Sequence, residues 1–276
     1  MHRGEAQILG ACRLGEAHGP RSQMLRCIDF PTMVRDGVGW GAPTGVTAGV
    51  LAHNGFTGAP ALTCQGPHWM DLGDHWKLVT DTHYKPYPCC RWAHPSIDAA
   101  AELMTRHALS HHDIASVEIK TFHNATRLAG HTPVSADEFA YSIAFPVACM
   151  IVHGQVGVSE LDISALSNPE ILRISTATTL IDDPHLTQIS DGKRWAQVSI
   201  LMRDGKRHEA APRTPRGDTD LPLSDGEISD KYHLFADPIL GGETAERIET
   251  LCAEFDQLDA SGVQGLLDII LQKPGV

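Results

Sequence analysis

The stretch YKPYPCCRWAHPSIDA, residues 84–99, is the clearest starting point for predicting the fold. It combines closely spaced prolines and two adjacent cysteines with Lys85, Arg91 and His94, whose side chains bind anions or transfer protons. From Pro95 onward, apolar residues recur at helical spacing. The pattern predicts a helix over residues 95–107, directly after a proline-rich segment.

The residues after this helix alternate in polarity. Val117, Ile119 and Thr121 would face one side, with a Glu and a Lys between them facing the other. This period of two is typical of a half-buried strand. We therefore expect a strand over residues 116–122.

Further elements are predicted towards the C-terminus from periodicity and turn residues. They are a helix over residues 136–153, kinked at Pro146 and ended by Gly154, strands over residues 173–181 and 195–202, and a turn at residues 203–206 leading into residues 207–210. The Asp-Gly pair in that turn favours a tight hairpin. The middle of the chain is therefore expected to be α+β.

Both ends of the chain show helical periodicity instead. Helices are predicted over residues 6–18, 43–54, 243–252 and 263–271, and residues 212–223 have the composition of a linker. Gly41, Gly45 and Gly49 lie on one face of the second helix, which predicts that another backbone packs closely there. A membrane-dimer interpretation fails because the segment is short and ends in polar residues.

These patterns predict an α+β fold made of a partial, discontinuous all-α domain and an inserted mixed domain. The expected helical domain comprises residues 1–78 and 212–276, and residues 79–211 form the inserted domain. The apolar and glycine-lined faces within residues 1–75 need covering, which indicates missing sequence or a second chain.

Composition narrows the classes of partner. The 276 residues include 22 Lys and Arg against 34 Asp and Glu, a net charge of -12, so nucleic acid is not an expected partner. A few Arg and Lys can still form a local pocket for an anionic metabolite. No signal peptide or membrane helix is predicted, so we expect no membrane partner and a cytoplasmic location. Seven irregularly spaced cysteines favour reduced thiols over a disulfide framework.

Residues 84–99 resemble the hallmark segment of the MmgE/PrpD family. In that family a Lys, an aromatic residue between prolines, a small or reactive residue and a His introducing a helix lie at the active-site cleft. Residues 27–42 and 51–58 are similar to the family's helical domain, and residues 136–143 are similar to a helix of its lid domain. The matches follow the family's order and span nearly the whole chain.

The resemblance implies an α+β lid on a helical domain, a homodimer, and metal-free lyase or isomerase chemistry on small di- or tricarboxylates. Known reactions are dehydration of 2-methylcitrate, decarboxylation of cis-aconitate and epimerisation of iminodisuccinate. It also implies that the chain starts partway through the helical domain, without helices that supply several catalytic groups. The leading hypothesis is a dehydratase-like lyase of a small hydroxy-polycarboxylate. The alternatives are a non-catalytic subunit that needs a complementary N-terminal helical chain, and an isomerase or epimerase.

Such chemistry needs cationic groups that hold carboxylates and an acid or base with a pKa near neutrality. His94 and Lys85 are therefore expected in acid/base roles and Arg91 as a carboxylate anchor, and the resemblance adds Tyr87 to the substrate-binding residues. The plainer alternatives are that His94 only caps its helix and that Lys85 or Arg91 is solvated or paired with Asp98.

Cys90 and Arg35 complete the predicted site. Cys90 is counted among the candidate catalytic residues, because the resemblance places it where the cis-aconitate decarboxylase branch has a catalytic histidine. A thiol cannot replace imidazole, so decarboxylation of cis-aconitate is disfavoured. The alternative for Cys90 is a buried apolar role. Arg35 stands where relatives often place a lysine, and would bind a carboxylate or pair with Asp36. Lys193 and Arg194 could reach the cleft from the lid, or belong to a solvated turn.

No metal or cofactor is predicted. Cys89 and Cys90 lack the gap of a Cys-x-x-Cys pair, and His68, His75 and His83 match no metal-ligand spacing. The absence of an iron-sulfur cysteine pattern disfavours the cluster chemistry of aconitase. A cofactor-free acid/base mechanism is therefore expected.

Overall fold

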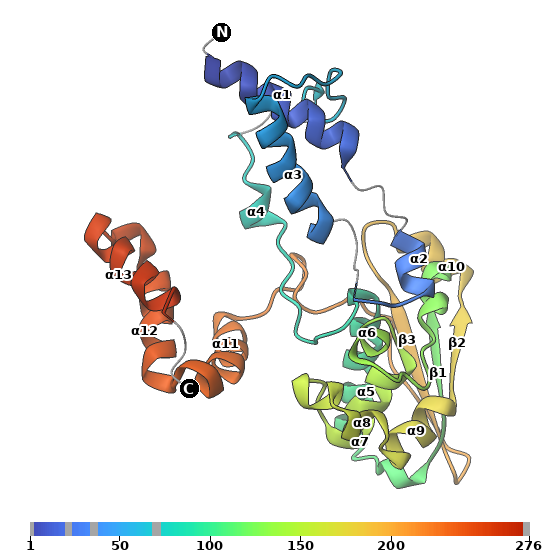
Figure 1. Cartoon of the computed structure of the whole chain (residues 1–276). Helices are drawn as coiled ribbons and strands as arrows, with labels where there is room; N and C mark the ends of the chain where they lie inside the picture. The colour runs from blue at the N-terminus through green and yellow to red at the C-terminus, as the bar shows by residue number, and fades with distance from the viewer. Residues whose placement is uncertain (1–2, 20–23, 34–37, 68–72, 273–276) are drawn as a thin grey trace. The chain divides into compact units, whose positions relative to one another are not determined.

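The computed structural model describes residues 3–19, 24–33, 38–67 and 73–272. Helices and one mixed sheet confirm the predicted α+β class (Figure 1). The chain divides into two compact units, Met1–Thr82 with Tyr87–Pro215, and His83–Pro86 with Arg216–Val276. The discontinuous helical domain and its lid stay a prediction.

The first unit contains the sheet and most of the helices. These helices are α1 (Arg3–His18), α2 (Met24–Asp29), α3 (Val38–His53), α4 (Lys77–Thr80), α5 (His94–Arg106), α6 (Ala136–Ala140), α7 (Ala144–His153), α8 (Ile163–Leu166), α9 (Pro169–Thr176) and α10 (Pro184–Ile189). The second unit contains α11 (Asp225–Leu240), α12 (Gly242–Ala253) and α13 (Ala260–Ile270). In the part of the chain that the structure describes, no helix has the length and apolar character needed to cross a membrane.

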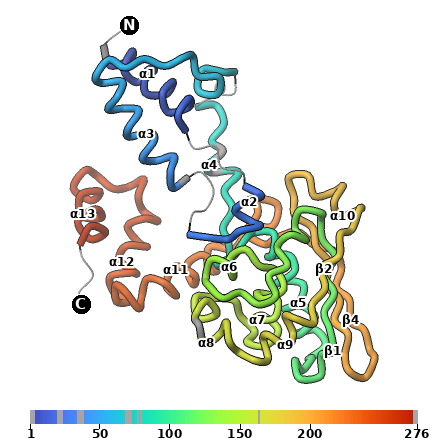
Figure 2. Tube along the Cα trace, turned by 45° about the vertical axis from the view of Figure 1, so that its right-hand side comes forward, coloured from blue at the N-terminus to red at the C-terminus, as the bar shows by residue number. Residues whose placement is uncertain are grey.

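The sheet has four strands in the order β2-β1-β3-β4. Strands β1, β2 and β4 are labelled in Figure 2. They are β1 (Ile114–Thr121), β2 (Thr178–Asp182), β3 (Ala196–Met202) and β4 (Arg207–Glu209). The central strand β1 pairs in parallel with β2 and antiparallel with β3, and β3 and β4 form the predicted hairpin. Gly205 permits its tight turn because it adopts a φ of 87°, a left-handed value that costs glycine little.

Helices cover the buried side of this sheet. Val117, Ile119 and Thr121 of β1 are buried, as the alternation predicts. Helix α5 packs on β3 and on α7, and α9 packs on α7 and β1 (Figure 1). Ile97, the first residue of the predicted stripe on α5, is fully buried in this core. The core therefore fixes the position at which α5 begins.

The single helix predicted over residues 136–153 is wrong, because the chain breaks it into α6 and α7. Ser142 lies in the break, where its hydroxyl donates to the Gly130 carbonyl oxygen at 2.6 Å and accepts from the Phe145 amide. Pro146 falls in the first turn of α7, where its missing N–H leaves no helical bond unmade. Gly154 ends α7 in the left-handed conformation, as predicted.

The strand predicted over residues 173–181 is wrong in its first half, which belongs to α9. The Asn168 side chain accepts hydrogen bonds from the amides of Glu170 and Ile171, and Pro169 occupies the first helical position. These start signals outweigh the β-branched residues that favour a strand. Only residues from Thr178 onward enter the sheet as β2.

Helices α1 and α3 pack against each other through Leu14, Ala48 and Ala52. The close contact predicted at Gly41, Gly45 and Gly49 is not found within the described residues, because a Cβ at any of these positions would meet nothing within 4 Å. Helix α1 instead uses the face of α3 that carries the two alanines.

The second unit contains a helix that the sequence patterns do not predict, α11. Ser224 and Glu227 form a capping box at its start, in which each side chain bonds to the other residue's backbone amide. Further along, the Tyr232 hydroxyl donates to the Ala245 carbonyl oxygen at 3.0 Å and so ties α11 to α12. The predicted helices at residues 243–252 and 263–271 are confirmed as α12 and α13.

His233 gives this unit a testable pH dependence. Its Nδ1 lies 2.8 Å from Asp237 and its Nε2 lies 2.9 Å from Glu249, and these hydrogen bonds raise the pKa of His233 above 6.5. A raised folded-state pKa adds stability that is fully present below the unfolded pKa and is lost as pH rises through the folded one. We expect His233→Gln to lower the urea midpoint at pH 5.5 and to lower it less at pH 8.5. An equal loss at both values would contradict this linkage.

Candidate active site

The predicted site is built around the start of α5. Before α5 lies a short 3-10 helix, η2 (Arg91–Ala93). The Arg91 carbonyl oxygen accepts a hydrogen bond from the His94 amide. The Cys90 amide donates to the Ala140 carbonyl oxygen at 2.7 Å and so anchors this turn to the end of α6. Pro95 follows in the first turn of α5. The local sequence therefore holds Cys90, Arg91 and His94 in one compact turn.

Tyr87 is joined to this turn through Asp98. Its hydroxyl donates to Asp98 Oδ1 at 2.6 Å, and the two residues are only 8% and 6% exposed. The ring of Tyr87 meets the ring of His94 edge-on, with centroids 5.2 Å apart. Asp98 thus bonds to Tyr87, and its suggested pairing with Lys85 or Arg91 stays a prediction. The role of Tyr87 in substrate binding stays a prediction.

The buried bond between Tyr87 and Asp98 should stabilise the start of α5. We expect Asp98→Ala to lower the free energy of unfolding by about 1–3 kcal/mol, because it removes the acceptor of a buried hydroxyl. Urea unfolding of Asp98→Ala, of Tyr87→Phe and of the double variant would measure the coupling free energy between the two side chains. The double variant should lose less than the two single losses added together; strict additivity would show that the bond contributes nothing.

His94 is completely buried, with 0% of its surface exposed. Its Nε2 lies 3.3 Å from the Cys89 carbonyl oxygen, a contact in which only the nitrogen can donate. That contact favours the tautomer with a proton on Nε2. Proton exchange between His94 and a substrate would therefore require its covering residues to move.

Lys85 belongs to the second unit, together with Lys231 of α11. Lys231 Nζ donates to the Lys85 carbonyl oxygen. Burial, and then the charge of Lys85, lower the pKa of Lys231. The Tyr84 amide donates to the Gly217 carbonyl oxygen at 2.9 Å, and His83 Nδ1 lies 2.9 Å from Asp218. These contacts fix the backbone of Lys85 within its own unit.

Two cationic residues have structural contacts that sequence reasoning missed. The guanidinium of Arg194 lies over the rings of Trp92 and Phe122, 5.8 and 5.6 Å from their centroids, so it packs beside the η2 turn. Lys231 is the second. Its contact with the Lys85 carbonyl oxygen joins residues 146 positions apart, so no local pattern around Lys231 predicts that contact. Arg35 lies outside the described residues.

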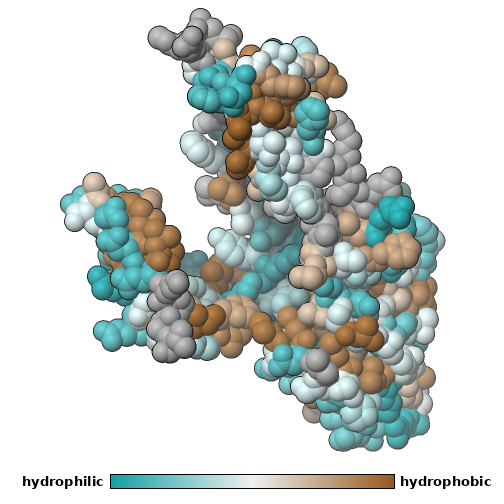
Figure 3. Space-filling view, in the orientation of Figure 1, coloured by the Kyte–Doolittle hydropathy of each residue, from teal (hydrophilic) through white to brown (hydrophobic). Residues whose placement is uncertain are grey.

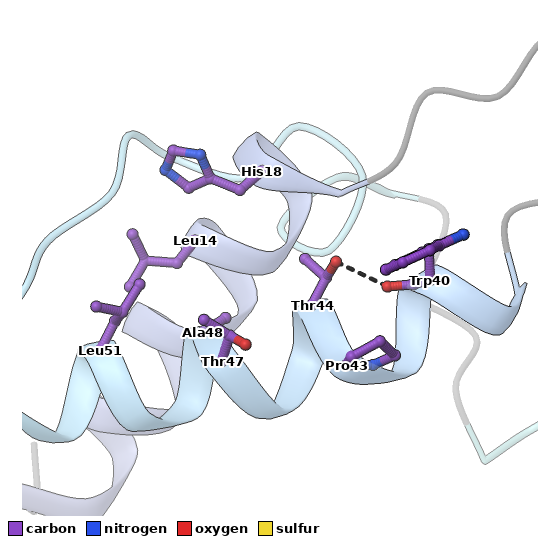
Figure 4. Close-up of a pocket in the computed structure, with 8 residues that line it drawn as sticks. All are labelled: Leu14, His18, Trp40, Pro43, Thr44, Thr47, Ala48 and Leu51. Atoms are coloured by element: carbon purple, nitrogen blue, oxygen red, sulfur yellow. Dashed lines mark hydrogen bonds between the residues drawn. The ribbon is translucent and has the colours of Figure 1, made fainter.

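A pocket of about 300 Å³ lies elsewhere, between α1 and α3 (Figure 4). Its lining residues are Leu14, His18, Trp40, Pro43, Thr44, Thr47, Ala48 and Leu51. The Thr44 hydroxyl donates to the Trp40 carbonyl oxygen at 2.8 Å, so one of the few polar groups that line the pocket is already hydrogen-bonded. None of the predicted site residues lines this pocket.

Comparison with known proteins places residues 87–257 in a described family, since they match the model of the MmgE/PrpD C-terminal domain. The match begins at Tyr87 and covers α5, the sheet and helices α11 and α12.

Three curated relatives carry related names. A cis-aconitate decarboxylase-like protein of Aspergillus oryzae is 25% identical over 64% of this chain and 38% of its own length. The cis-aconitate decarboxylase of Aspergillus terreus is 24% identical over 86% of this chain and 54% of its own length. The human cis-aconitate decarboxylase is 21% identical over 66% of this chain and 39% of its own length. The chain thus spans about half or less of the length of these relatives.

Proposed function

This chain belongs to the MmgE/PrpD family, and from that membership we propose that it acts as a lyase of a small hydroxy-polycarboxylate, alone or as part of a larger assembly. The observation that carries the proposal is the family match over residues 87–257, which starts in the segment that holds His94. The relatives named as cis-aconitate decarboxylases support a lyase acting on a small tricarboxylate. At 21–25% identity they do not fix the substrate.

The reaction proposed first is dehydration of the 2-methylcitrate type. A base removes a proton from the carbon beside a carboxylate, the electron pair forms the double bond, and the hydroxyl leaves as water after protonation by an acid. His94 and Lys85 take these acid/base roles in the proposal. Arg91 and Arg35 hold the carboxylates, and Tyr87 contributes to binding. No cofactor is needed for these steps.

Dehydration is preferred to decarboxylation because of Cys90. The resemblance to the family implies a histidine at this position in the decarboxylase branch, and the thiol of Cys90 does not supply a neutral acid/base pair at pH 7. An isomerase or epimerase reaction would use the same proton abstraction without expelling a hydroxyl. Identification of the products therefore distinguishes dehydration, decarboxylation, and isomerisation or epimerisation.

The test is turnover of a defined set of acids. The purified chain is incubated with citrate, 2-methylcitrate, cis-aconitate and iminodisuccinate, while alkene absorbance and product NMR spectra are recorded. Formation of a new alkene with loss of the hydroxyl supports the dehydratase proposal. Release of carbon dioxide from cis-aconitate, or epimerisation without an alkene, would overturn it in favour of another reaction of the family.

The second candidate function is that of a subunit that needs a complementary helical chain or a second copy. Large apolar side chains on α3 favour it, since Trp40, Val46 and Val50 are 60%, 70% and 58% exposed. Apolar surface is also visible over the α1–α3 helices in Figure 3. Gel filtration with light scattering tests this proposal, alone and with the upstream helical polypeptide of a family member. A stable monomer that ignores that polypeptide would contradict it.

A further inference from the structure

Three side chains that commonly bind metal ions converge where a short turn meets α9. The turn is η3 (His111–Asp113), directly before β1. His111, His112 and Glu170 place one ligand atom each so that all three atoms lie within 4.8 Å of one another. Nδ1 of His112 lies 3.7 Å from Oε2 of Glu170, and the two imidazole rings are 4.0 Å apart between centroids. The chain thus brings together two imidazoles and a carboxylate from segments far apart in sequence.

Arg173 holds both segments in place. Its guanidinium donates to the carbonyl oxygens of His111, at 2.8 Å, and Ile114, at 3.0 Å. The same guanidinium donates to Oε2 of Glu170, one turn earlier on α9, at 3.0 Å. Hydrogen bonds of this kind orient ligands in metal sites. The positive charge of Arg173 opposes a cation, so we expect weaker binding than in a closed structural zinc site.

We propose that His111, His112 and Glu170 form a binding site for a divalent transition-metal ion of the Zn²⁺ type. Two imidazoles and one carboxylate are a donor set that Zn²⁺ accepts, with water completing the coordination. Bonds of about 2.0–2.2 Å require the ligand atoms to approach one another more closely than they do here. The side chain of His112 is 70% exposed and can rotate to close that distance. This inference departs from the expectation of a chain without metal and does not depend on the proposed lyase activity.

The test is Zn²⁺ binding by the full, untagged chain at pH 7.5, measured by isothermal titration calorimetry. Binding of Co²⁺, followed by its visible absorption, reports the coordination geometry. We expect one Zn²⁺ per chain, and a loss of affinity of about tenfold or more in His112→Ala and in Glu170→Gln. His112→Ala changes an exposed residue, so it should leave the fold intact, as circular dichroism would verify.

His123→Ala is the matched control. His123 is also exposed and lies 2.7 Å from a carboxylate, that of Asp182, but within the described residues it is not part of a group of three possible metal ligands. Its replacement should leave Zn²⁺ affinity unchanged. The proposal is overturned if the wild-type chain binds no Zn²⁺, if His112→Ala and Glu170→Gln bind it as tightly as the wild type, or if His123→Ala loses as much affinity as they do.

Discussion

Replacing His94 with glutamine is expected to lower kcat for the hydroxy-polycarboxylate substrate by about 10²- to 10⁴-fold, the usual contribution of a positioned acid or base. Glutamine approximates the size of the imidazole, and its amide can still donate to the Cys89 carbonyl oxygen, as Nε2 of His94 is placed to do at 3.3 Å. It cannot accept and release a proton near pH 7. The substitution therefore removes the proton transfer and keeps the packing.

The measurement is steady-state turnover of the acid that the wild-type chain converts, together with the complementary chain if activity requires it. Because His94 is fully buried against Tyr87, a structural role has to be separated from a catalytic one. A catalytic role lowers kcat with little change in thermal midpoint, whereas a structural role lowers the midpoint first. His123→Gln serves as the control on an exposed histidine. Unchanged turnover in His94→Gln would remove His94 from the mechanism.

Sequence patterns correctly predicted those helices and strands for which the spacing of apolar residues and the residues at the element's ends indicate the same structure. In β1 the alternation matches burial on one side, and the Asp-Gly turn matches the hairpin between β3 and β4. The strand prediction was wrong over residues 173–176. These residues belong to a helix whose start signal, the cap at Asn168, lies upstream of the β-branched residues on which the strand prediction rested. Helix α11 was missed because its only clear start signal, the Ser224–Glu227 capping box, follows a segment with linker composition.

The sequence predicted the candidate site only for residues that are close to one another along the chain. Cys90, Arg91 and His94 share one turn of chain, so their proximity follows from the sequence alone. The hydrogen bond between Tyr87 and Asp98 depends on how the segment before η2 folds back on α5, so the sequence spacing of the two residues does not reveal it. Lys231 and Arg194 reach their contacts from distant elements. Such contacts arise from tertiary packing, which no spacing rule in the sequence encodes.

Gly217→Ala is expected to lower the free energy of unfolding by about 2–4 kcal/mol, through backbone strain and a clash. Gly217 has a φ of 87°, which an alanine adopts only with strain. A Cβ at this position would fall well inside contact distance of the Tyr84 carbonyl oxygen, and the obstacle is backbone that cannot turn aside. Urea unfolding and hydrogen exchange of the Tyr84 amide, which donates to the Gly217 carbonyl oxygen, would measure the effect.

Gly154→Ala separates the two causes. Gly154 has a similar φ of 73°, but a Cβ there would meet nothing within 4 Å, so only the strain of about 1–2 kcal/mol remains. A larger loss in Gly217→Ala isolates the clash with Tyr84; equal losses would contradict it. Since Lys85 follows Tyr84 directly, displacement of that backbone also moves a residue assigned to proton transfer. Gly217→Ala should then reduce kcat as well, whereas Gly154→Ala should lose stability alone.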